Sequence, residues 1–428
     1  MGAADRAALG MRVGTAFLPR PWHRLDDNRQ ITVRANLQPV SMQRLCAMLQ
    51  VLLISRTLAA QFTILRAKRM FQDVPGRPAA PITCLPILCE SPQMTHPMIV
   101  TLPDGTSMPR LGLGTRAIGG RWMAGGEPAG WGETDDDVSR ATIRAGVAGG
   151  VRLFDTAQAY GAGHAERLLG DVLAAHPEVR IVTKVGLIIN EDARTVERAT
   201  TNPDDIEASL DASRRRLRRD RIEMVLLHLN SLSPDDAAPV FDRLEALRHR
   251  GWIGHFGWST DFPASVAAMT GRAGFAVVEH AMNVFFAADG MGRGIAAHGL
   301  LPLIRSPLAM GLLGGRYPAG HVFGPDDVRS TTTDWMDYFK DGKVTQAHAT
   351  RLERLRAALT SQGRSMAQGA LAWLFAANAR VVPVPGFRTV AQVQDLCGAI
   401  EKGPLDHKSY AAVEANVSRE AEGDPRER

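Results

Sequence analysis

Residues 151–170, VRLFDTAQAYGAGHAERLLG, are the stretch of sequence that decides the fold. Their first five residues form a short apolar run that ends in the carboxylate of Asp155, which is typical of a buried β-strand. The following TAQAYGAGHAE is rich in glycine and small residues, so we interpret it as a loop that holds Tyr160 above the end of that strand. Polar groups that directly follow a buried strand favour an α/β fold whose chemistry lies at the strand ends.

Similar apolar runs recur from Met98 onward, and longer amphipathic segments separate them. This alternation predicts βα units around a parallel sheet. Eight repeats favour a closed (β/α)8 TIM barrel over an open doubly wound sheet, and no GxGxxG fingerprint follows the first strand. The predicted strands are residues 111–114, 151–155, 180–184, 222–228, 252–258, 275–280, 300–305 and 380–385.

Capping signals place individual elements around these strands. One amphipathic segment ends at Gly149, as a helix C-terminus often does. Another begins with Asn202 and Pro203, which fit an N-cap and the first position of a helix. Ahead of the first barrel strand, Asp104-Gly105 predicts the turn of an N-terminal β-hairpin.

The positive charge of the chain is concentrated before Met94. The whole sequence carries a formal charge of +5, but residues 1–93 carry +7 and the remainder −2. We therefore divide the chain into a basic extension of low order (1–93), a barrel (94–417) and a charged tail (418–428). Because the body is slightly acidic, its charge gives no indication of nucleic-acid binding.

Three interpretations of the extension remain open: a translation start at Met94 or Met98, a targeting or interaction arm, and an additional ordered domain. The extension is rich in arginine like a transit peptide, but it shows no clear cleavage signature. Its most apolar stretch, residues 45–65, is interrupted by Arg56, so we expect no membrane span. Four cysteines without a disulfide pattern favour a reducing, cytoplasmic location.

Three successive predicted strands end in a polar side chain, namely Asp155, Lys184 and His228. Tyr160 lies in the loop that follows the first of them. Each residue alone has an ordinary explanation as a structural ion pair, a hydrogen-bonded imidazole or loop packing. Because the strand ends of a parallel barrel meet at one face, we expect all four groups to converge there.

These four groups, with the DTAQAYGAGHAE stretch, resemble the active site of the aldo-keto reductase family, which implies reduction of a carbonyl by hydride. That reaction needs a proton donor and stabilisation of the developing oxyanion. Tyr160 is the candidate acid. A free phenol has a pKa near 10, and we expect the ammonium of Lys184 to lower the pKa of this one. Asp155 would hold Lys184 charged and in place, and His228 would orient the carbonyl or share the proton relay.

The same stretch and several others resemble the aldo-keto reductase family. The segments that carry the resemblance are FDTAQAYGAGHAERLLG, IVTKVG, IEMVLLHLNS, GWIGHFGWST, SPLAMGLLGGRY and VPGFRTVAQVQDL, and it extends over about residues 98–417. The resemblance implies a (β/α)8 barrel, NADPH or NADH as cofactor, and the reversible reduction of an aldehyde or ketone. It also implies a catalytic tetrad of Asp155, Tyr160, Lys184 and His228.

The resemblance further implies contacts to the cofactor. The loop after the last strand would hold the adenosine end, where the forked guanidinium of Arg388 suits a 2′-phosphate and favours NADPH over NADH. The backbone near Leu308 would approach the pyrophosphate, with Arg316 as a charge partner. The implied cofactor-binding residues are Gly114, Thr115, Arg116, Asp155, Ser259, Thr260, Glu279, Leu308, Gly311, Leu313, Arg316, Gly386, Arg388, Thr389, Gln392 and Asp395.

Several positions depart from the family pattern. Glu279 stands where a glutamine usually contacts the nicotinamide carboxamide, and an ionised carboxylate accepts hydrogen bonds but cannot donate them. Met282 replaces a tyrosine that often stacks on the nicotinamide, and Thr260 and Leu396 each replace an asparagine. Arg116 replaces a tryptophan that often follows the first strand. We expect these changes to weaken the hold on the carboxamide and to leave the fold unchanged.

Two loops, residues 116–136 and 317–342, are expected to shape the pocket of a small-molecule carbonyl substrate. Besides the reductase, two other functions stay open. One is a cofactor-binding, redox-sensing regulatory subunit with weak turnover, and the other is a metal-dependent barrel enzyme, although no set of metal ligands occurs at the strand ends. The sequence does not predict the oligomeric state. Candidate pocket walls are Trp122, Met123, Trp131, Trp335, Met336 and Tyr338.

Overall fold

The computed structural model describes residues 98–318, 320–331 and 338–419. The predictions for residues 1–93 lie outside the described residues, as does most of the tail. None of the helices within the described ranges is both long and apolar enough to cross a membrane.

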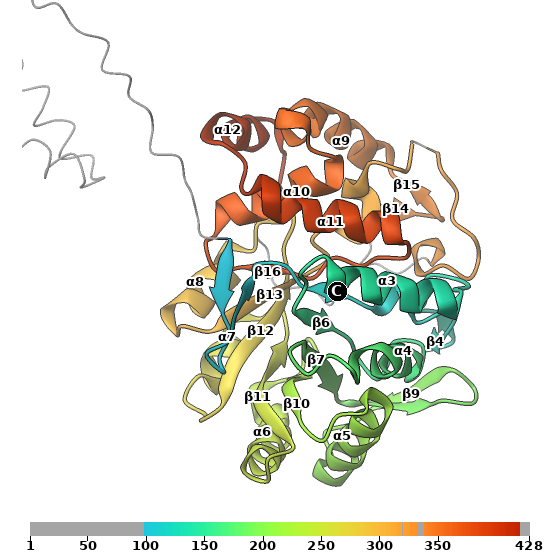
Figure 1. Cartoon of the computed structure of the whole chain (residues 1–428), viewed down its shortest axis with the longest axis vertical. Coiled ribbons are helices and arrows are strands. Elements are labelled where there is room, and N and C mark those ends of the chain that lie inside the picture. Colours follow the sequence, from blue (N-terminus) through green and yellow to red (C-terminus); the bar gives the residue numbers. More distant parts are fainter. Residues whose placement is uncertain (1–97, 319, 332–337, 420–428) are drawn as a thin grey trace, which may run out of the picture. The chain divides into compact units, whose positions relative to one another are not determined.

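Eight parallel strands form a barrel at the centre of the described chain (Figure 1). They are β3 (Leu113–Gly114), β6 (Leu153–Asp155), β7 (Arg180–Val185), β10 (Ile222–Leu227), β11 (Ile253–Ser259), β12 (Phe275–Ala281), β13 (Leu301–Arg305) and β16 (Val382–Pro383). They pair in the order β16-β13-β12-β11-β10-β7-β6-β3. The first strand joins the last because the Gly112 N–H donates to the Pro383 carbonyl at 3.0 Å and the Gly114 N–H to the Pro385 carbonyl at 2.9 Å. The predicted barrel and its eight strands are confirmed, and the doubly wound alternative is wrong.

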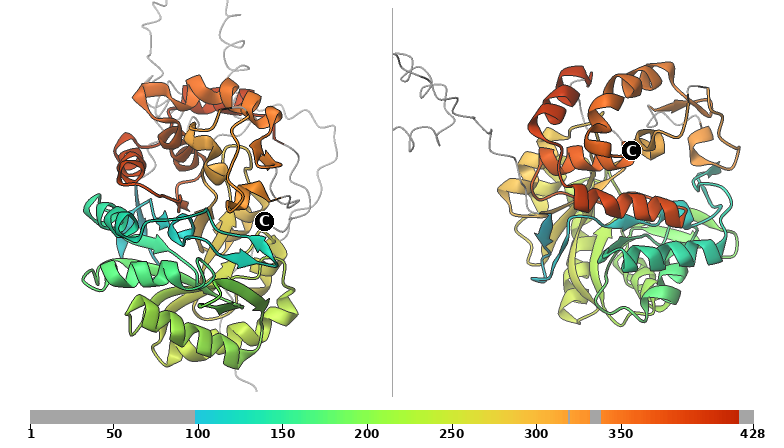
Figure 2. Two further views of the ribbon diagram at one scale, coloured as in Figure 1. Left: turned by 90° about the vertical axis from the view of Figure 1, so that its right-hand side faces the viewer. Right: turned by 45° about the horizontal axis from the view of Figure 1, so that its top comes forward.

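Helices surround the barrel, and α9 to α12 gather on one side of it (Figures 1 and 2). The helices are α3 (Asp136–Ala148), α4 (His164–Leu173), α5 (Pro203–Leu217), α6 (Pro234–His249), α7 (Pro263–Met269), α8 (Asp289–Ala297), α9 (Gln346–Leu359), α10 (Met366–Ala377), α11 (Val390–Lys402) and α12 (His407–Asn416). The predicted caps are confirmed: the Asn202 side chain accepts the Asp204 N–H at 2.9 Å at the start of α5, and α3 ends at Gly149.

The interior of the barrel is filled by apolar side chains of the strands, among them Leu153, Val182 and Met224. The hairpin of β1 (Ile99–Thr101) and β2 (Ser107–Pro109) contributes Val100 and Met108 to the same cluster. Because the hairpin precedes the first strand, it covers the N-terminal end of the barrel and leaves the C-terminal end for the site. The predicted N-terminal hairpin is confirmed.

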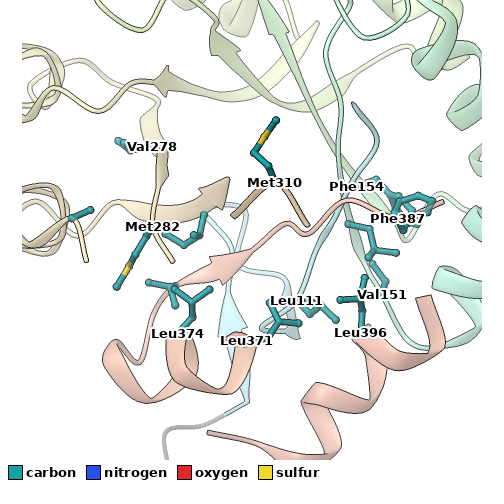
Figure 3. Close-up of a cluster of buried hydrophobic side chains, with 14 of the residues drawn as sticks. Leu111, Val151, Phe154, Val278, Met282, Met310, Leu371, Leu374, Phe387 and Leu396 are labelled. Carbon is teal, nitrogen blue, oxygen red and sulfur yellow. The ribbon is translucent and has the colours of Figure 1, made fainter. Parts of the chain in front are cut away.

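A second apolar layer lies between the strands and the helices (Figure 3). Phe154 of β6 meets Phe387 edge to face, with ring centroids 6.5 Å apart. Leu371 of α10 and Leu396 of α11 belong to the same layer and are almost completely buried. Strands buried on both faces are expected where helices cover a parallel sheet. Leu396, which departs from the family pattern, therefore belongs to the core, and it also lines the cavity described below.

Short strands that the sequence did not predict occur in the loops at the C-terminal end of the barrel. They are β4 (Met123–Ala124), β5 (Glu127–Pro128), β8 (Leu187–Asn190), β9 (Thr195–Ala199), β14 (Phe339–Lys340) and β15 (Lys343–Val344). The first four form one sheet in the order β5-β4-β9-β8. Strands of two residues are too short to show the alternation from which a strand is recognised, and β8 is only half-buried along its length.

Candidate active site

The four side chains of the predicted tetrad meet at the C-terminal end of the barrel. Lys184 Nζ lies 2.5 Å from Asp155 Oδ1 and 3.3 Å from Tyr160 Oη. The rings of Tyr160 and His228 meet edge to face with centroids 5.9 Å apart. Asp155, Tyr160 and Lys184 are buried, and His228 is half-buried. The structure thus brings together the four groups that the sequence singled out.

The register of the parallel strands explains this convergence. Lys184 on β7 is paired with Leu226 near the end of β10, and Asp155 at the end of β6 is paired with Val182. The His228 N–H donates to the last carbonyl of β7 at 2.8 Å. Consecutive strands therefore end at similar heights, and the residues at their ends share one face of the barrel.

Lys184 connects the polar groups of the site. Its ammonium donates to Asp155, to the Thr156 carbonyl at 3.1 Å and to Tyr160. An ammonium has three donors and no acceptor, so the phenol oxygen must accept here and its own proton remains available to a ligand. Glu279 Oε2 also lies 3.1 Å from Lys184 Nζ but makes no hydrogen bond to any described residue. One buried ammonium therefore faces two buried carboxylates.

The charges around Tyr160 do not lower its pKa overall. Burial raises the pKa of Tyr160, and the negative charges of Asp155 and Glu279 add to this, while Lys184 opposes both. Lys184 does act to lower the pKa of Tyr160, as expected, but desolvation of the phenolate outweighs the attraction of the ammonium and the pKa is raised. Burial also raises the pKa of Asp155 well above its usual range, assisted by Glu279. Burial alone would lower the pKa of Lys184, but the two carboxylates reverse this and keep the ammonium charged.

His228 is neutral at neutral pH. Burial lowers the pKa of its imidazole well below the usual range, and the positive charges of Lys184, Arg116 and Arg305 add to the effect. A neutral imidazole offers one N–H donor and one acceptor. Its Nδ1 atom has no hydrogen-bond partner among the described residues. The ring is therefore available to hold a polar ligand atom.

A cavity of about 380 Å³ opens over these residues. Tyr160, His228 and many of the predicted cofactor residues line it. These cofactor residues are Gly114, Arg116, Asp155, Ser259, Glu279, Leu308, Gly311, Arg316, Gly386, Arg388, Gln392 and Asp395.

Four predicted cofactor residues do not line the cavity. The hydroxyl of Thr115 donates to the Asp155 carbonyl at 3.1 Å, and that of Thr260 donates to the Asn230 carbonyl at 2.6 Å. Leu313 is completely buried in the core. Thr389 is the N-cap of α11, where its hydroxyl accepts the N–H of the third helical residue. The position of these residues favours a structural role over direct contact.

The far end of the cavity fits the phosphates of a dinucleotide. A Cβ atom at Gly386 would have no neighbour nearer than 3.7 Å, so the backbone there is open to a ligand. Arg388 donates to the Trp131 carbonyl at 2.6 Å and to the Glu133 carbonyl. Its guanidinium thus holds the loop after β3 and lines the cavity at the same time. Glu279 Oε2 lies 3.1 Å from Lys184 Nζ but has no hydrogen bond to a described residue, so it could accept one from a ligand.

Several cavity residues were not predicted from the sequence. Arg305 ends β13, so the strand-end argument, applied to the seventh strand, would have found it. Asn230 and Asn283 lie in loops just beyond strand ends, and Arg329 lies in the long loop after β13. No pattern in the sequence distinguishes these three. The structure also describes no group of three histidine, cysteine, aspartate or glutamate side chains able to hold a metal ion.

The residues predicted to form the pocket walls do not all line the cavity. Trp131 and Tyr338 line the cavity. Trp122 is buried outside the cavity lining, and Met123 is exposed. Trp335 and Met336 lie outside the described residues.

Comparison with known proteins identifies the family of the chain and agrees with its fold. The chain matches the family model described as "Aldo/keto reductase family" over residues 110–417. It is 27% identical over 305 residues to the aldo-keto reductase YhdN of Bacillus subtilis, covering 68% of this chain and 85% of YhdN. Among solved structures, the glycerol dehydrogenase AKR11B4 from Gluconobacter oxydans is 26% identical with a TM-score of 0.63, covering 74% of this chain and 94% of that one. An aldo-keto reductase from Klebsiella pneumoniae, solved in complex with NADPH, is 20% identical with a TM-score of 0.54, covering 76% and 96% of the two chains.

Proposed function

Because the chain belongs to the aldo/keto reductase family, we propose that it reduces an aldehyde or ketone to an alcohol with NADPH, and that Tyr160 is the general acid. The observation that carries the proposal is the hydrogen bond of 3.3 Å from Lys184 to Tyr160 Oη at the wall of the cavity. It leaves the phenol proton free for transfer to a substrate oxygen. The raised pKa of Tyr160 keeps that proton in place at neutral pH.

The residues divide the chemistry between them. When bound, the nicotinamide supplies the hydride that reaches the carbonyl carbon. Tyr160 gives its proton to the carbonyl oxygen as negative charge develops there. Lys184 stabilises the phenolate that remains, and Asp155 holds Lys184 in place through the 2.5 Å contact. His228, which is neutral, donates a hydrogen bond that orients the carbonyl.

The cofactor end of the cavity supports NADPH rather than NADH. Arg388 and Arg316 both line that end, and neither forms an ion pair within the described part of the chain. A guanidinium and a phosphate carry opposite charges and frequently form two parallel hydrogen bonds, which a neutral carbonyl cannot match. The 2′-phosphate of NADPH would therefore compete effectively with the Trp131 and Glu133 carbonyls for Arg388.

A consumption assay tests the proposal. The full chain is mixed with NADPH or NADH and a panel of aldehydes, ketones and sugars, and loss of the reduced cofactor is followed by absorbance. We expect turnover with at least one carbonyl class and faster turnover with NADPH. Tight NADPH binding in a fluorescence titration without turnover on any compound would contradict the reductase and favour a cofactor-binding regulatory subunit.

A further inference from the structure

Arg116 is fixed at the mouth of the barrel beside Tyr160. It begins the short 3₁₀ helix η1 (Arg116–Ile118), directly after β3. The loop after β3 is pressed against the loop that carries Tyr160, because a Cβ atom at Gly119 would lie 2.9 Å from the Gly161 nitrogen. A Cβ atom at Gly161, whose φ is +66°, would overlap the Gly119 carbonyl. Two glycines thus permit this close approach and set the position of Arg116 relative to the acid.

The guanidinium of Arg116 is only partly satisfied. Its Nη2 donates to the Ala129 carbonyl at 3.2 Å, and its carbon lies 5.9 Å from the centre of the Trp122 ring. Its Nε is buried and has no hydrogen-bond partner among the described residues. Within the described ranges no carboxylate forms an ion pair with it. Burial lowers the pKa of Arg116, which reflects how unfavourable this unpaired charge is.

The other cations near the acid have counter-ions. Lys184 faces Asp155 and Glu279. Arg305 is paired with Asp261. Arg329 is paired with Asp327 at 2.6 Å and is stacked on aromatic rings. Arg116 is therefore the cation at the acid's end of the cavity that forms no ion pair with a described residue, although the charge of Asp327 partly offsets its burial.

The cofactor does not account for this charge. Arg316 and Arg388 line the same cavity, and they are the cations proposed above for the phosphates of the cofactor. At the end of Arg116 the cavity is lined by Tyr160 and His228, which face the carbonyl to be reduced. An anion bound by Arg116 would consequently be part of the substrate.

We propose that Arg116 binds a carboxylate of the substrate, so that the enzyme reduces short aldehydes or ketones that carry a carboxylate. A guanidinium with free N–H groups matches the two oxygens of a carboxylate, and such pairs are stronger than neutral hydrogen bonds. The inference rests on the carbonyl reduction proposed above. In that reaction the carbonyl carbon gains the hydride and the oxygen gains the Tyr160 proton, which yields a hydroxy acid and oxidised cofactor.

A matched pair of substrates tests this assignment. The probes are 4-oxobutanoate and its methyl ester, which share the aldehyde and differ in charge. We expect kcat/KM of the full chain to be roughly 10–100-fold higher for the acid, as a hydrogen-bonded ion pair in a buried site allows. Arg116→Met should remove this preference, so that kcat/KM for the acid falls to the level of the ester, mainly through a higher KM for the acid. Arg116→Lys should restore part of the preference, since it keeps the charge and loses the fork.

Arg121→Met is the matched control. Arg121 lies five residues further on in the same loop, half-exposed, in surface ion pairs with Glu133 and Asp326. Arg121→Met changes the net charge by the same amount as Arg116→Met, but it should not alter the preference for the acid. An equal loss for acid and ester in Arg116→Met would overturn the inference, since Arg116 would then act on Tyr160 or the cofactor. Reduction of other aldehydes without any preference for the acid would also overturn it and leave the proposed function standing, whereas no NADPH consumption with any carbonyl would refute the proposed function itself.

Discussion

Two buried clusters of charged side chains lie in the same barrel, and they differ in how completely their members are paired. Between α4 and α5, Glu166 accepts from Arg216 at 2.7 Å and from Thr183 at 2.5 Å. Arg216 also donates to Glu191 at 2.7 Å and to Ser213 at 3.1 Å. Each charged group in this outer cluster has several partners, so we interpret it as structural.

The cluster at the mouth is incompletely paired. Glu279 Oε2, His228 Nδ1 and Arg116 Nε have no hydrogen bonds to described residues, and Arg116 forms no ion pair with any of them. Unsatisfied buried groups are unfavourable, and they are retained where a ligand completes them. Both clusters are buried and charged. The completeness of their hydrogen bonds and ion pairs is therefore what distinguishes the candidate site from the structural cluster. The variants below test this difference, from the largest expected effect to the smallest.

Tyr160→Phe should have the largest effect on activity. It removes the proton donor and keeps the ring, so we expect turnover on a model aldehyde to fall roughly 10²–10⁴-fold. NADPH binding, measured by fluorescence titration, and the melting temperature should change little. Tyr317→Phe is the matched control, since Tyr317 lines the same cavity without contacting Lys184. Unchanged turnover in Tyr160→Phe would refute its role as the acid.

Arg216→Met should lower the stability of the fold and leave the turnover of the folded enzyme unchanged. It leaves the carboxylate of Glu166 buried without its cation, which costs about 3–5 kcal/mol of unfolding free energy in comparable buried pairs. Urea denaturation measures this loss. The control is Arg215→Met, because Arg215 is 69% exposed and its pair with Asp211 should contribute less than about 1 kcal/mol. A large fall in kcat of the folded variant would mean that the outer cluster is not merely structural.

Arg388→Met should reduce the preference for NADPH. The change removes the donor expected to hold the 2′-phosphate, so the KM for NADPH should rise about tenfold or more while that for NADH stays nearly constant. Steady-state kinetics with both cofactors measure the ratio. A parallel rise in both values would instead indicate that Arg388 acts by holding the loop through the Trp131 and Glu133 carbonyls.

Glu279→Gln should shift the pH dependence of reduction. The negative charge of Glu279 raises the pKa of Tyr160, so its removal lowers that pKa. Reduction requires the neutral phenol, and the alkaline fall in kcat should therefore move to lower pH. A profile of kcat against pH for both proteins measures the shift. The control is Glu178→Gln, a change at an exposed carboxylate, which should leave the profile unchanged.

Much of the fold was predictable because its signals are local. Each barrel strand is a short apolar run, and the caps at Asn202 and Gly149 are read within a few residues of the helix ends. The polar residues at three strand ends also identified the tetrad, since parallel strands end on one face. The strands β4 and β5 were not predicted because a strand of two residues is too short to show the alternation of apolar and polar residues.

The electrostatics of the site were not predictable in this way. Lys184 was expected to lower the pKa of Tyr160, but the extent of burial, which outweighs that charge, follows only from packing. Glu279 was recognised as a departure from the family pattern, yet its ion pair with Lys184 joins β12 to β7 across the barrel. Arg329 enters the cavity from a long loop whose sequence does not distinguish it, whereas Arg305 ends β13 and follows the strand-end pattern.

The sequence by itself determined the eight βα repeats, the N-terminal hairpin, the family and the identity of the four groups at the mouth, since each depends on residues close together in the chain. Only the tertiary structure decided which buried charges are paired, in which direction the pKa of Tyr160 moves, and that Arg116 lies unpaired beside it. Those properties depend on the distances between residues far apart in sequence and on how much water packing excludes. Both quantities set the strength of hydrogen bonds and of Coulomb interactions.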